Sequence, residues 1–263
     1  MQAVPAPTVP GMTLKNGPLV EELLLPASDG RPLAATLVHP SDEKRGALVL
    51  LGAVGAPRSY YRAFAAHAEV SIGFFGLTAR DRMLQFATLN FDGCIEQIYP
   101  PLCVGAAVVL RGPDMWDAQT FHRQVIEHGV TVADLTTAYW FLLVQEFARD
   151  GVRGHGQLRQ VHAGGEAMPP EGIRAWREAG LSHVRLLNTY GPTEAAVTAA
   201  VLDCASYVDG DEPVPAQMPI GVPLAGRRLC VVDQDMNLAP VGVPGELCIG
   251  GALLARGYLR RGG

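Results

Sequence analysis

Short apolar runs alternate with amphipathic segments through the middle of the chain, and this alternation restricts the fold more than any other feature. Apolar residues recur at helical spacing in the segments 92–103, 118–128, 139–149 and 171–179. Between these segments lie apolar runs that predict strands, at 106–110, 130–135, 157–163 and 183–187. Such alternation predicts an α/β fold with parallel strands and helices on the faces of the sheet.

The first part of the chain has a different character. Residues 1–18 are rich in proline, and we expect them to be disordered. Three predicted strands and a predicted helix follow, at 19–26, 32–39, 47–54 and 58–68. Their order resembles the beginning of an α/β-hydrolase, so we assign residues 19–68 to a hydrolase-like stub that ends near a seam at 68–76. Because its strand edges are unpaired, we expect this stub to fold poorly without a partner edge.

The last part, residues 218–263, contains two apolar runs separated by Pro and Gly. This pattern predicts a small antiparallel β subdomain. The main α/β unit then comprises residues 77–217.

Charge and composition exclude several classes of protein. A net charge of −5 and a pI near 5.8 argue against a nucleic-acid surface. The apolar runs are too short to span a bilayer, and no signal peptide is visible. The 5 cysteines are scattered, so we interpret them as small buried hydrophobic residues in a reducing compartment and expect a cytoplasmic protein.

The segment 188–194 carries the clearest chemical signal. It follows an apolar run, and Gly191-Pro192 forces a turn whose backbone N–H groups can attract phosphate. The carboxylate of Glu194 is a ligand suited to Mg²⁺. An ordinary strand-to-helix turn capped by Thr193 fits the same residues. The following segment 195–201 fits either a helix or a second strand.

Several motifs together resemble one family. Asn188-Thr189-Tyr190-Gly191-Pro192-Thr193-Glu194 resembles the fifth core motif of adenylate-forming enzymes, especially the amino-acid-activating domains of nonribosomal peptide synthetases. Residues 84–94 resemble the family's fourth core motif, and residues 163–167 resemble its glycine segment. Residues 245–251 together with 255–259 resemble its sixth core motif. They occur in the family's order over residues 77–261, which implies part of the N-terminal adenylation domain followed by a small antiparallel β subdomain.

The resemblance implies a site for ATP and Mg²⁺. Tyr190 would stack on adenine, and Asn188 would bond to its amino group. Thr193 would contact the α-phosphate and Glu194 would bind the metal, and these two are the expected catalytic residues. The remaining residues expected at the nucleotide are Gly164, Gly165, Glu166 and Gly191. A plain strand-to-helix turn also explains the two adjacent glycines.

The resemblance also implies an amino-acid pocket, in which Asp92 would hold the substrate α-ammonium group. The other expected lining residues are Gly93, Glu96, Asp134, Val161, Ala163, Thr189, Val197 and Thr198. Asp92 and Glu96 lie four residues apart on one helix face, where a solvated acidic face is the alternative. Because Glu96 and Asp134 lie among small apolar residues, we expect a basic substrate such as lysine or ornithine. We predict that the three carboxylates share one cavity and raise one another's pKa when it is empty.

Parts of the family's catalytic set are not found in residues 1–263. The lysine-bearing phosphate loop would precede the fourth motif; a C-terminal lysine domain and a phosphopantetheine carrier domain would follow the sixth. One hypothesis is therefore a truncated adenylation domain completed by a carrier protein or a complementing synthetase segment. A second is a non-catalytic remnant or fusion that binds ligand weakly. An ester hydrolase is disfavoured because the sequence lacks a Gly-x-Ser-x-Gly motif.

We expect no amino-acid-dependent pyrophosphate exchange by the isolated chain of 263 residues. Loss of one cation at the reacting carboxylate removes several kcal/mol of transition-state stabilisation, by analogy with the loss of an oxyanion donor. The measurement is radioactive pyrophosphate exchange with each amino acid in turn. Robust exchange that Glu194→Ala abolishes would contradict this expectation.

Overall fold

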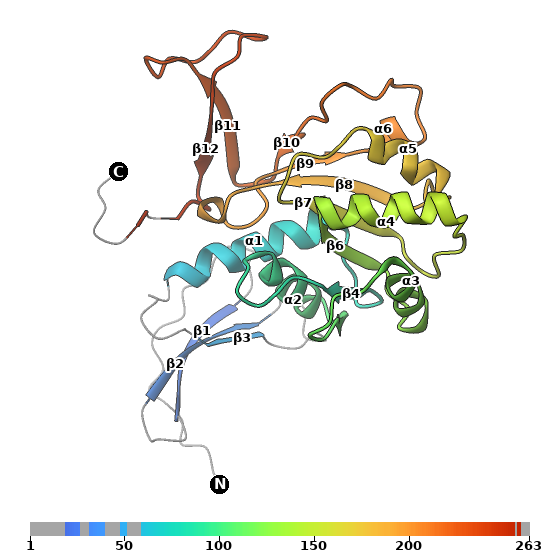
Figure 1. The fold of residues 1–263 in the computed structure, drawn as a ribbon. Coiled ribbons are helices and arrows are strands. Elements are labelled where there is room, and N and C mark those ends of the chain that lie inside the picture. The colour runs from blue at the N-terminus through green and yellow to red at the C-terminus, as the bar shows by residue number, and fades with distance from the viewer. Residues whose placement is uncertain (1–18, 27–31, 40–47, 52–58, 256, 259–263) are drawn as a thin grey trace.

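The computed structural model describes residues 19–26, 32–39, 48–51, 59–255 and 257–258. Its centre is a seven-stranded sheet with the order β10-β9-β8-β7-β6-β4-β5 (Figure 1). In chain order the strands are β4 Arg82–Gln85, β5 Ala107–Leu110, β6 Val132–Thr136, β7 Gln160–Gly164, β8 Arg185–Tyr190, β9 Ala200–Asp203 and β10 Val222–Pro223. The strands from β5 to β8 are parallel, as the alternation of apolar runs and amphipathic segments predicted.

Helices cover both faces of this sheet (Figure 1). The helices are α1 Ser59–Phe75, α2 Gly93–Cys103, α3 Ala118–Glu127, α4 Thr137–Asp150, α5 Glu171–Glu178 and the short α6 Ala205–Val208. On one face, aromatic residues of α3, α4 and α5 such as Phe121, Trp140 and Trp176 pack into the main core. On the other face, Phe75 of α1 packs with Met83 and Leu187 of the sheet. Burial of large apolar side chains on both faces is the main force that holds a sheet of this kind.

Two smaller sheets flank the main one. β1 Leu19–Pro26, β2 Pro32–His39 and β3 Leu48–Leu51 form an antiparallel sheet, in close agreement with the predicted strands. β11 Arg227–Val232 and β12 Glu246–Gly251 form the antiparallel pair expected in the last part of the chain. The expected disorder of residues 1–18 concerns residues outside the described part.

The structure decides one alternative that the sequence left open, and it differs from the predicted elements at two places. The open segment 195–201 begins within the 3₁₀ turn η1 Thr193–Ala195 and then enters β9, which runs antiparallel to β8. Strand β4 was missed because it has four residues, of which two are polar. The first helix ends at Phe75 rather than Ala68, so it continues through the expected seam. The separate origin of residues 19–68 remains a prediction.

The cysteines differ in exposure. Cys94 and Cys204 are buried, whereas Cys230 is exposed, so the expectation of buried cysteines is wrong for Cys230. Burial raises the pKa of the Cys204 thiol to about 12.

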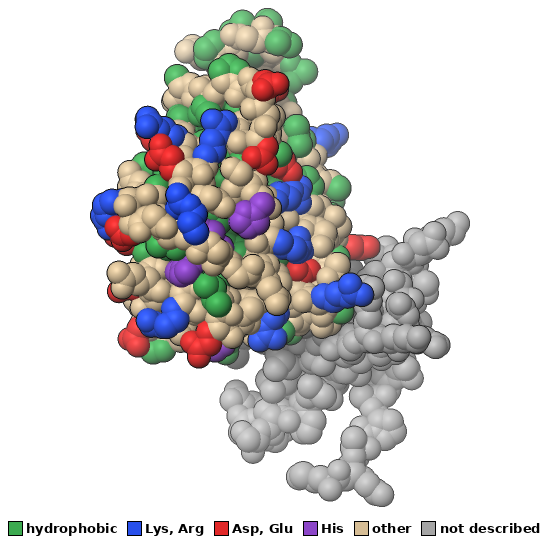
Figure 2. Space-filling view, turned by 90° about the vertical axis from the view of Figure 1, so that its right-hand side faces the viewer, with side chains coloured by type: hydrophobic (Ala, Val, Ile, Leu, Met, Phe, Trp, Pro, Cys, Tyr) green, Lys and Arg blue, Asp and Glu red, His purple; other side chains and the backbone are tan. Residues whose placement is uncertain are grey.

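None of the helices in the described ranges is both long and apolar enough to cross a bilayer. Figure 2 shows arginine and acidic side chains interspersed over one face of the molecule.

Candidate active site

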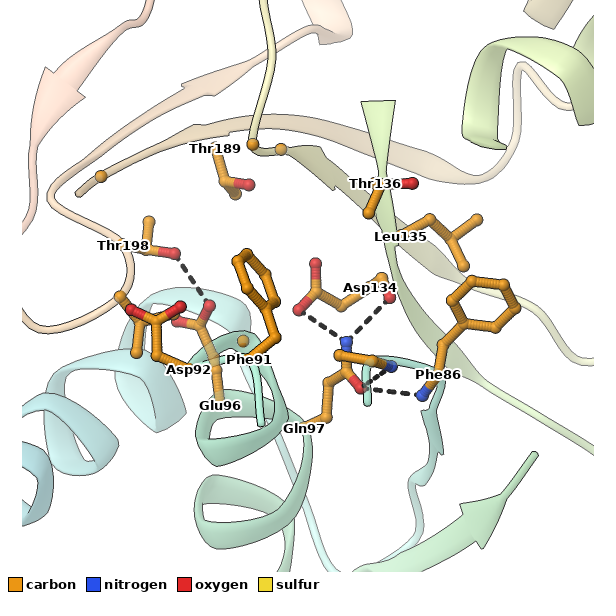
Figure 3. A pocket seen from close by; sticks show the side chains of 16 residues that line it. Phe86, Phe91, Asp92, Glu96, Gln97, Asp134, Leu135, Thr136, Thr189 and Thr198 are labelled. Carbon is orange, nitrogen blue, oxygen red and sulfur yellow. Dashed lines mark hydrogen bonds between the residues drawn. The ribbon is translucent and has the colours of Figure 1, made fainter. Parts of the chain in front are cut away.

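A pocket lies at the carboxyl ends of the parallel strands, where ligands bind in open α/β sheets. It holds about 540 Å³ of empty space that is partly open to solvent. β6, β7, β8, the start of α2 and the loops after β4 and β8 all contribute to its wall (Figure 3). The lining residues are Phe86, Ala87, Phe91, Asp92, Gly93, Glu96, Gln97, Asp134, Leu135, Thr136, Gly164, Gly165, Thr189, Gly191, Val197 and Thr198.

The pocket gathers most of the residues that the sequence assigned to an amino-acid site. Those that line it are Asp92, Gly93, Glu96, Asp134, Thr189, Val197 and Thr198. Val161 and Ala163 do not line it, because they are 2% and 0% exposed and pack into the main core. Their register neighbours on β6 are Ala133 and Leu135, which belong to the same core. Side chains alternate between the faces of a strand, so Asp134 lies on the other face, towards α2.

Asp92 occupies the position before α2, yet its side chain makes no hydrogen bond that caps the helix. Its carboxylate points into the pocket (Figure 3). The helix N-terminus behind it favours negative charge. Asp92 is therefore placed to receive a cationic group of a ligand.

Glycine is required at two positions of the pocket wall. A Cβ atom at Gly164 would lie 2.2 Å from the Thr189 hydroxyl oxygen, so β7 and β8 can approach only without a side chain there. Gly165 has a φ of +90°, which residues with a Cβ rarely adopt. Both glycines were expected near a nucleotide, and both line the pocket.

Of the other residues expected at a nucleotide, Gly191 lines the pocket, whereas Glu166, Asn188, Tyr190, Thr193 and Glu194 do not. Asn188 is 4% exposed, and its Nδ2 donates to the Pro219 carbonyl at 2.8 Å. Tyr190 ends β8 and is partly exposed, so it does not lie in a packed core. Glu166, Thr193 and Glu194 are exposed. Thr193 and Glu194 form the turn η1 immediately after Gly191, which does line the pocket.

The fifth and sixth sequence motifs meet at Glu194. The Tyr258 hydroxyl donates to Oε1 of Glu194, and the Ala255 backbone N–H donates to its carbonyl at 2.7 Å. The Tyr258 hydrogen bond lowers the pKa of Glu194. Among the described residues, no group of three or more His, Cys, Asp or Glu side chains could hold a metal by itself. A Mg²⁺ ion at Glu194 would therefore depend on oxygen atoms of a bound phosphate, which is its usual mode of binding.

Both carboxylate oxygens of Glu96 interact with side chains of the protein. The residue is 2% exposed. The Nε2 of His67 lies 3.0 Å from its Oε1, the Ser71 hydroxyl donates to Oε1 at 3.1 Å, and the Thr198 hydroxyl donates to Oε2 at 2.8 Å. Burial alone would raise the pKa of Glu96, but His67 and the hydrogen bonds outweigh it and lower the pKa. The predicted rise in pKa is therefore wrong for Glu96.

Asp134 has a different environment. Gln97 Nε2 donates to its carbonyl at 3.0 Å and to its Oδ2 at 3.2 Å (Figure 3). Burial, and next the charge of Glu96, raise the pKa of Asp134. The predicted rise is confirmed for this residue. A cation beside Asp134 would therefore stabilise the charged form of this carboxylate.

His67, Gln97 and Arg227 were not predicted from the sequence as residues of this site. Gln97 also accepts hydrogen bonds from the backbone N–H groups of Phe86 and Ala87, at 2.8 and 2.9 Å, and so holds the loop after β4. His67 was assigned to another unit of the chain, although its spacing of four from Ser71 put both on one helix face. The signal at Arg227 was a charged residue at the start of an apolar strand.

A mostly parallel sheet with a glycine-lined pocket at its strand ends is typical of open α/β proteins that bind a ligand at this edge of the sheet. The model of the AMP-binding enzyme family matches residues 52–259. The chain belongs to this family.

Its relatives are nonribosomal peptide synthetases, as the motifs predicted. The chain is 38% identical over 191 residues to the isonitrile lipopeptide synthase of Streptomyces coeruleorubidus. The matched region covers 71% of this chain and 13% of that protein. Two solved structures share the fold. FmoA3, a nonribosomal peptide synthetase in an AMPPNP-bound form, has a TM-score of 0.68 and 23% identity, covering 90% of this chain and 23% of FmoA3. PA1221, which contains adenylation and PCP domains, has a TM-score of 0.63 and 24% identity, covering 90% of this chain and 42% of PA1221. The chain thus spans less than half of each of these proteins.

Proposed function

We propose that this chain is part of an amino-acid-activating adenylation domain, which joins the carboxylate of an amino acid to the α-phosphate of ATP. The observation that carries the proposal is the placement of Asp92 and the glycines 164, 165 and 191 on one pocket, directly before the turn that holds Thr193 and Glu194. A carboxylate and a glycine-lined wall in one pocket suit a zwitterionic ligand that must meet a phosphate.

In the proposed reaction Asp92 holds the α-ammonium group, which turns the substrate carboxylate towards the glycine-lined end of the pocket. A carboxylate oxygen then forms a bond to the α-phosphorus, the bond to the β-phosphate oxygen breaks, and pyrophosphate leaves with the electron pair. Thr193 would orient the α-phosphate through its hydroxyl group. Glu194 would hold Mg²⁺, whose charge offsets that of the phosphates when it is bound. A carrier protein is the proposed acceptor of the activated acid.

We propose a basic amino acid as the substrate. Since Glu96 already accepts hydrogen bonds from its own chain, Asp134 is the side chain that can receive a second cation. Burial raises its pKa, so a lysine or ornithine ammonium group would stabilise its charged form. The proposed specificity therefore depends on one carboxylate rather than two.

Matched variants of the two aspartates test this proposal. Asp92→Asn is expected to weaken binding of every α-amino acid, because all share the α-ammonium group. Asp134→Asn is expected to weaken binding of lysine by about 30-fold and to leave norleucine, which lacks the side-chain amine, within about twofold. The measurement is calorimetric titration with the lysyl and norleucyl sulfamoyl adenosines, which mimic the adenylate without reacting. Equal loss of both ligands in Asp134→Asn would contradict the basic preference, and absence of binding to the wild type would contradict the function itself.

A further inference from the structure

A chain of buried polar side chains connects the β11–β12 pair to the wall of the pocket. Its members are Arg227 at the start of β11, His67 in α1, Glu96 in α2 and Thr198, and their exposed fractions are 5%, 0%, 2% and 4%. Nη2 of Arg227 lies 2.8 Å from Nδ1 of His67, and Nε2 of His67 lies 3.0 Å from Oε1 of Glu96. The Thr198 hydroxyl completes the chain at 2.8 Å from Oε2. Four segments distant in sequence are thereby joined in one buried network.

The direction of each hydrogen bond follows from the chemistry of the groups. A guanidinium group can only donate, so Nδ1 of His67 accepts and carries no hydrogen. The ring hydrogen is then on Nε2, which donates to Glu96. His67 therefore bridges the guanidinium group of Arg227 and the carboxylate of Glu96 through its two ring nitrogens.

Arg227 also holds the turn that precedes Thr198. Its Nη2 donates to the carbonyl of Ala196 at 2.9 Å and to that of Ala195 at 3.2 Å. This turn is strained, because Ala196 and Val197 have φ angles of 58° and 67°. Residues with a Cβ atom rarely adopt this left-handed backbone, so the conformation needs support from its surroundings.

The hydrogen bonds form a closed ring around this turn. Arg227 donates to the carbonyl groups at the beginning of the turn. The hydroxyl group of Thr198, at the end of the turn, donates to Glu96. Both Val197 and Thr198 line the pocket. Removing any member of the ring would free a strained segment that forms one wall of the site.

We propose that Arg227, His67 and Glu96 are positioning residues that hold the turn 195–198 as a pocket wall, and that Glu96 is not the acceptor of a substrate cation. The inference rests on the proposed function for the identity of the ligand, but not for the ring itself. It assigns to the β11–β12 pair a direct influence on the pocket. It also separates the two acidic side chains, since Asp134 would set the preference for a cation and Glu96 would support all ligands alike.

The first test compares selectivity rather than affinity. With the full chain, Glu96→Gln and His67→Gln are expected to weaken the lysyl and norleucyl sulfamoyl adenosines by the same factor, about tenfold. The ratio of the two dissociation constants stays within about twofold of the wild type. If Glu96→Gln weakens the lysyl ligand at least tenfold more than the norleucyl ligand, Glu96 binds the cation and the proposal is overturned.

The second test needs no ligand and so separates the ring from the proposed function. Nitrogen NMR of the imidazoles, with His67→Gln to assign the signal, is expected to show His67 as the neutral Nε2–H tautomer at neutral pH. Arg227→Met is expected to shift the methyl resonances of Val197 and Thr198, whereas Arg228→Met, at the exposed neighbouring position, leaves them in place. Should Arg227→Met not fold, Arg227→Lys, which lacks the planar fork, is expected to shift the same methyl groups. A doubly protonated His67, or unchanged methyl signals in a folded Arg227 variant, would overturn the proposal even if ligands bind.

Discussion

Gly191→Ala is expected to destabilise the protein by about 3 kcal/mol or more, because the new side chain would collide with backbone atoms that cannot move independently. A Cβ atom at this position would lie 2.0 Å from the Val197 carbonyl oxygen and 2.6 Å from the Ala199 nitrogen. The Ala199 N–H donates to the Tyr190 carbonyl at 2.8 Å, so the strand pairing beside the turn would also be disturbed. Urea unfolding followed by circular dichroism measures the loss.

Gly73→Ala is the matched control for this substitution. Gly73 lies in α1, and a Cβ atom there would have no heavy atom within 4 Å. Alanine is favoured over glycine within a helix, so this variant is expected to gain about 0.5–1 kcal/mol. If Gly191→Ala unfolds at the same urea concentration as the wild type, the close packing of the turn 191–199 is incorrect.

Asp134→Asn is expected to stabilise the ligand-free protein, and increasingly so as the pH rises. The pKa of Asp134 is raised from 3.8 to about 8 in the folded state. Between these values the folded protein binds more protons than the unfolded chain, so the wild type loses stability from this group as pH increases. Asparagine does not titrate, and the difference between variant and wild type should therefore grow from about pH 4 to about pH 8 and then level off. Since Asp134 is partly exposed towards the pocket, solvent screening reduces the effect, and we expect about 2 kcal/mol at pH 8.

Unfolding by urea at a series of pH values measures this dependence. Asp211→Asn, at an exposed position, is the control and should follow the wild type at each pH. A constant difference between Asp134→Asn and the wild type from pH 4 to pH 8 would show that Asp134 is charged throughout this range. A variant that is less stable than the wild type at pH 8 would contradict the desolvation of its carboxylate.

Local sequence was sufficient for most secondary structure, whereas the shared location of the three acidic residues was implied by the resemblance to adenylation domains. The helix at α2 and the strands β6 and β7 have strong periodicity or unbroken apolar runs, so their assignment did not depend on distant contacts. Helical spacing put Asp92 and Glu96 on one helix face, the resemblance added Asp134, and the structure places all three on the pocket. Strand β4 was missed because four residues carry too little pattern.

The sequence by itself determined the α/β class, the turn at Gly191-Pro192 and the residues that resemble an adenylation site, because these features depend on near neighbours in the chain. Only the tertiary structure decided which charges in the pocket are already balanced. His67 and Arg227 lie 29 and 131 positions from Glu96 in the sequence, yet both belong to its network. From the sequence alone, the carboxylate of Glu96 has no visible partner and is therefore interpreted as a ligand-binding group. Its hydrogen-bond partners come from other elements, and their approach is decided by how α1, α2 and β11 pack together.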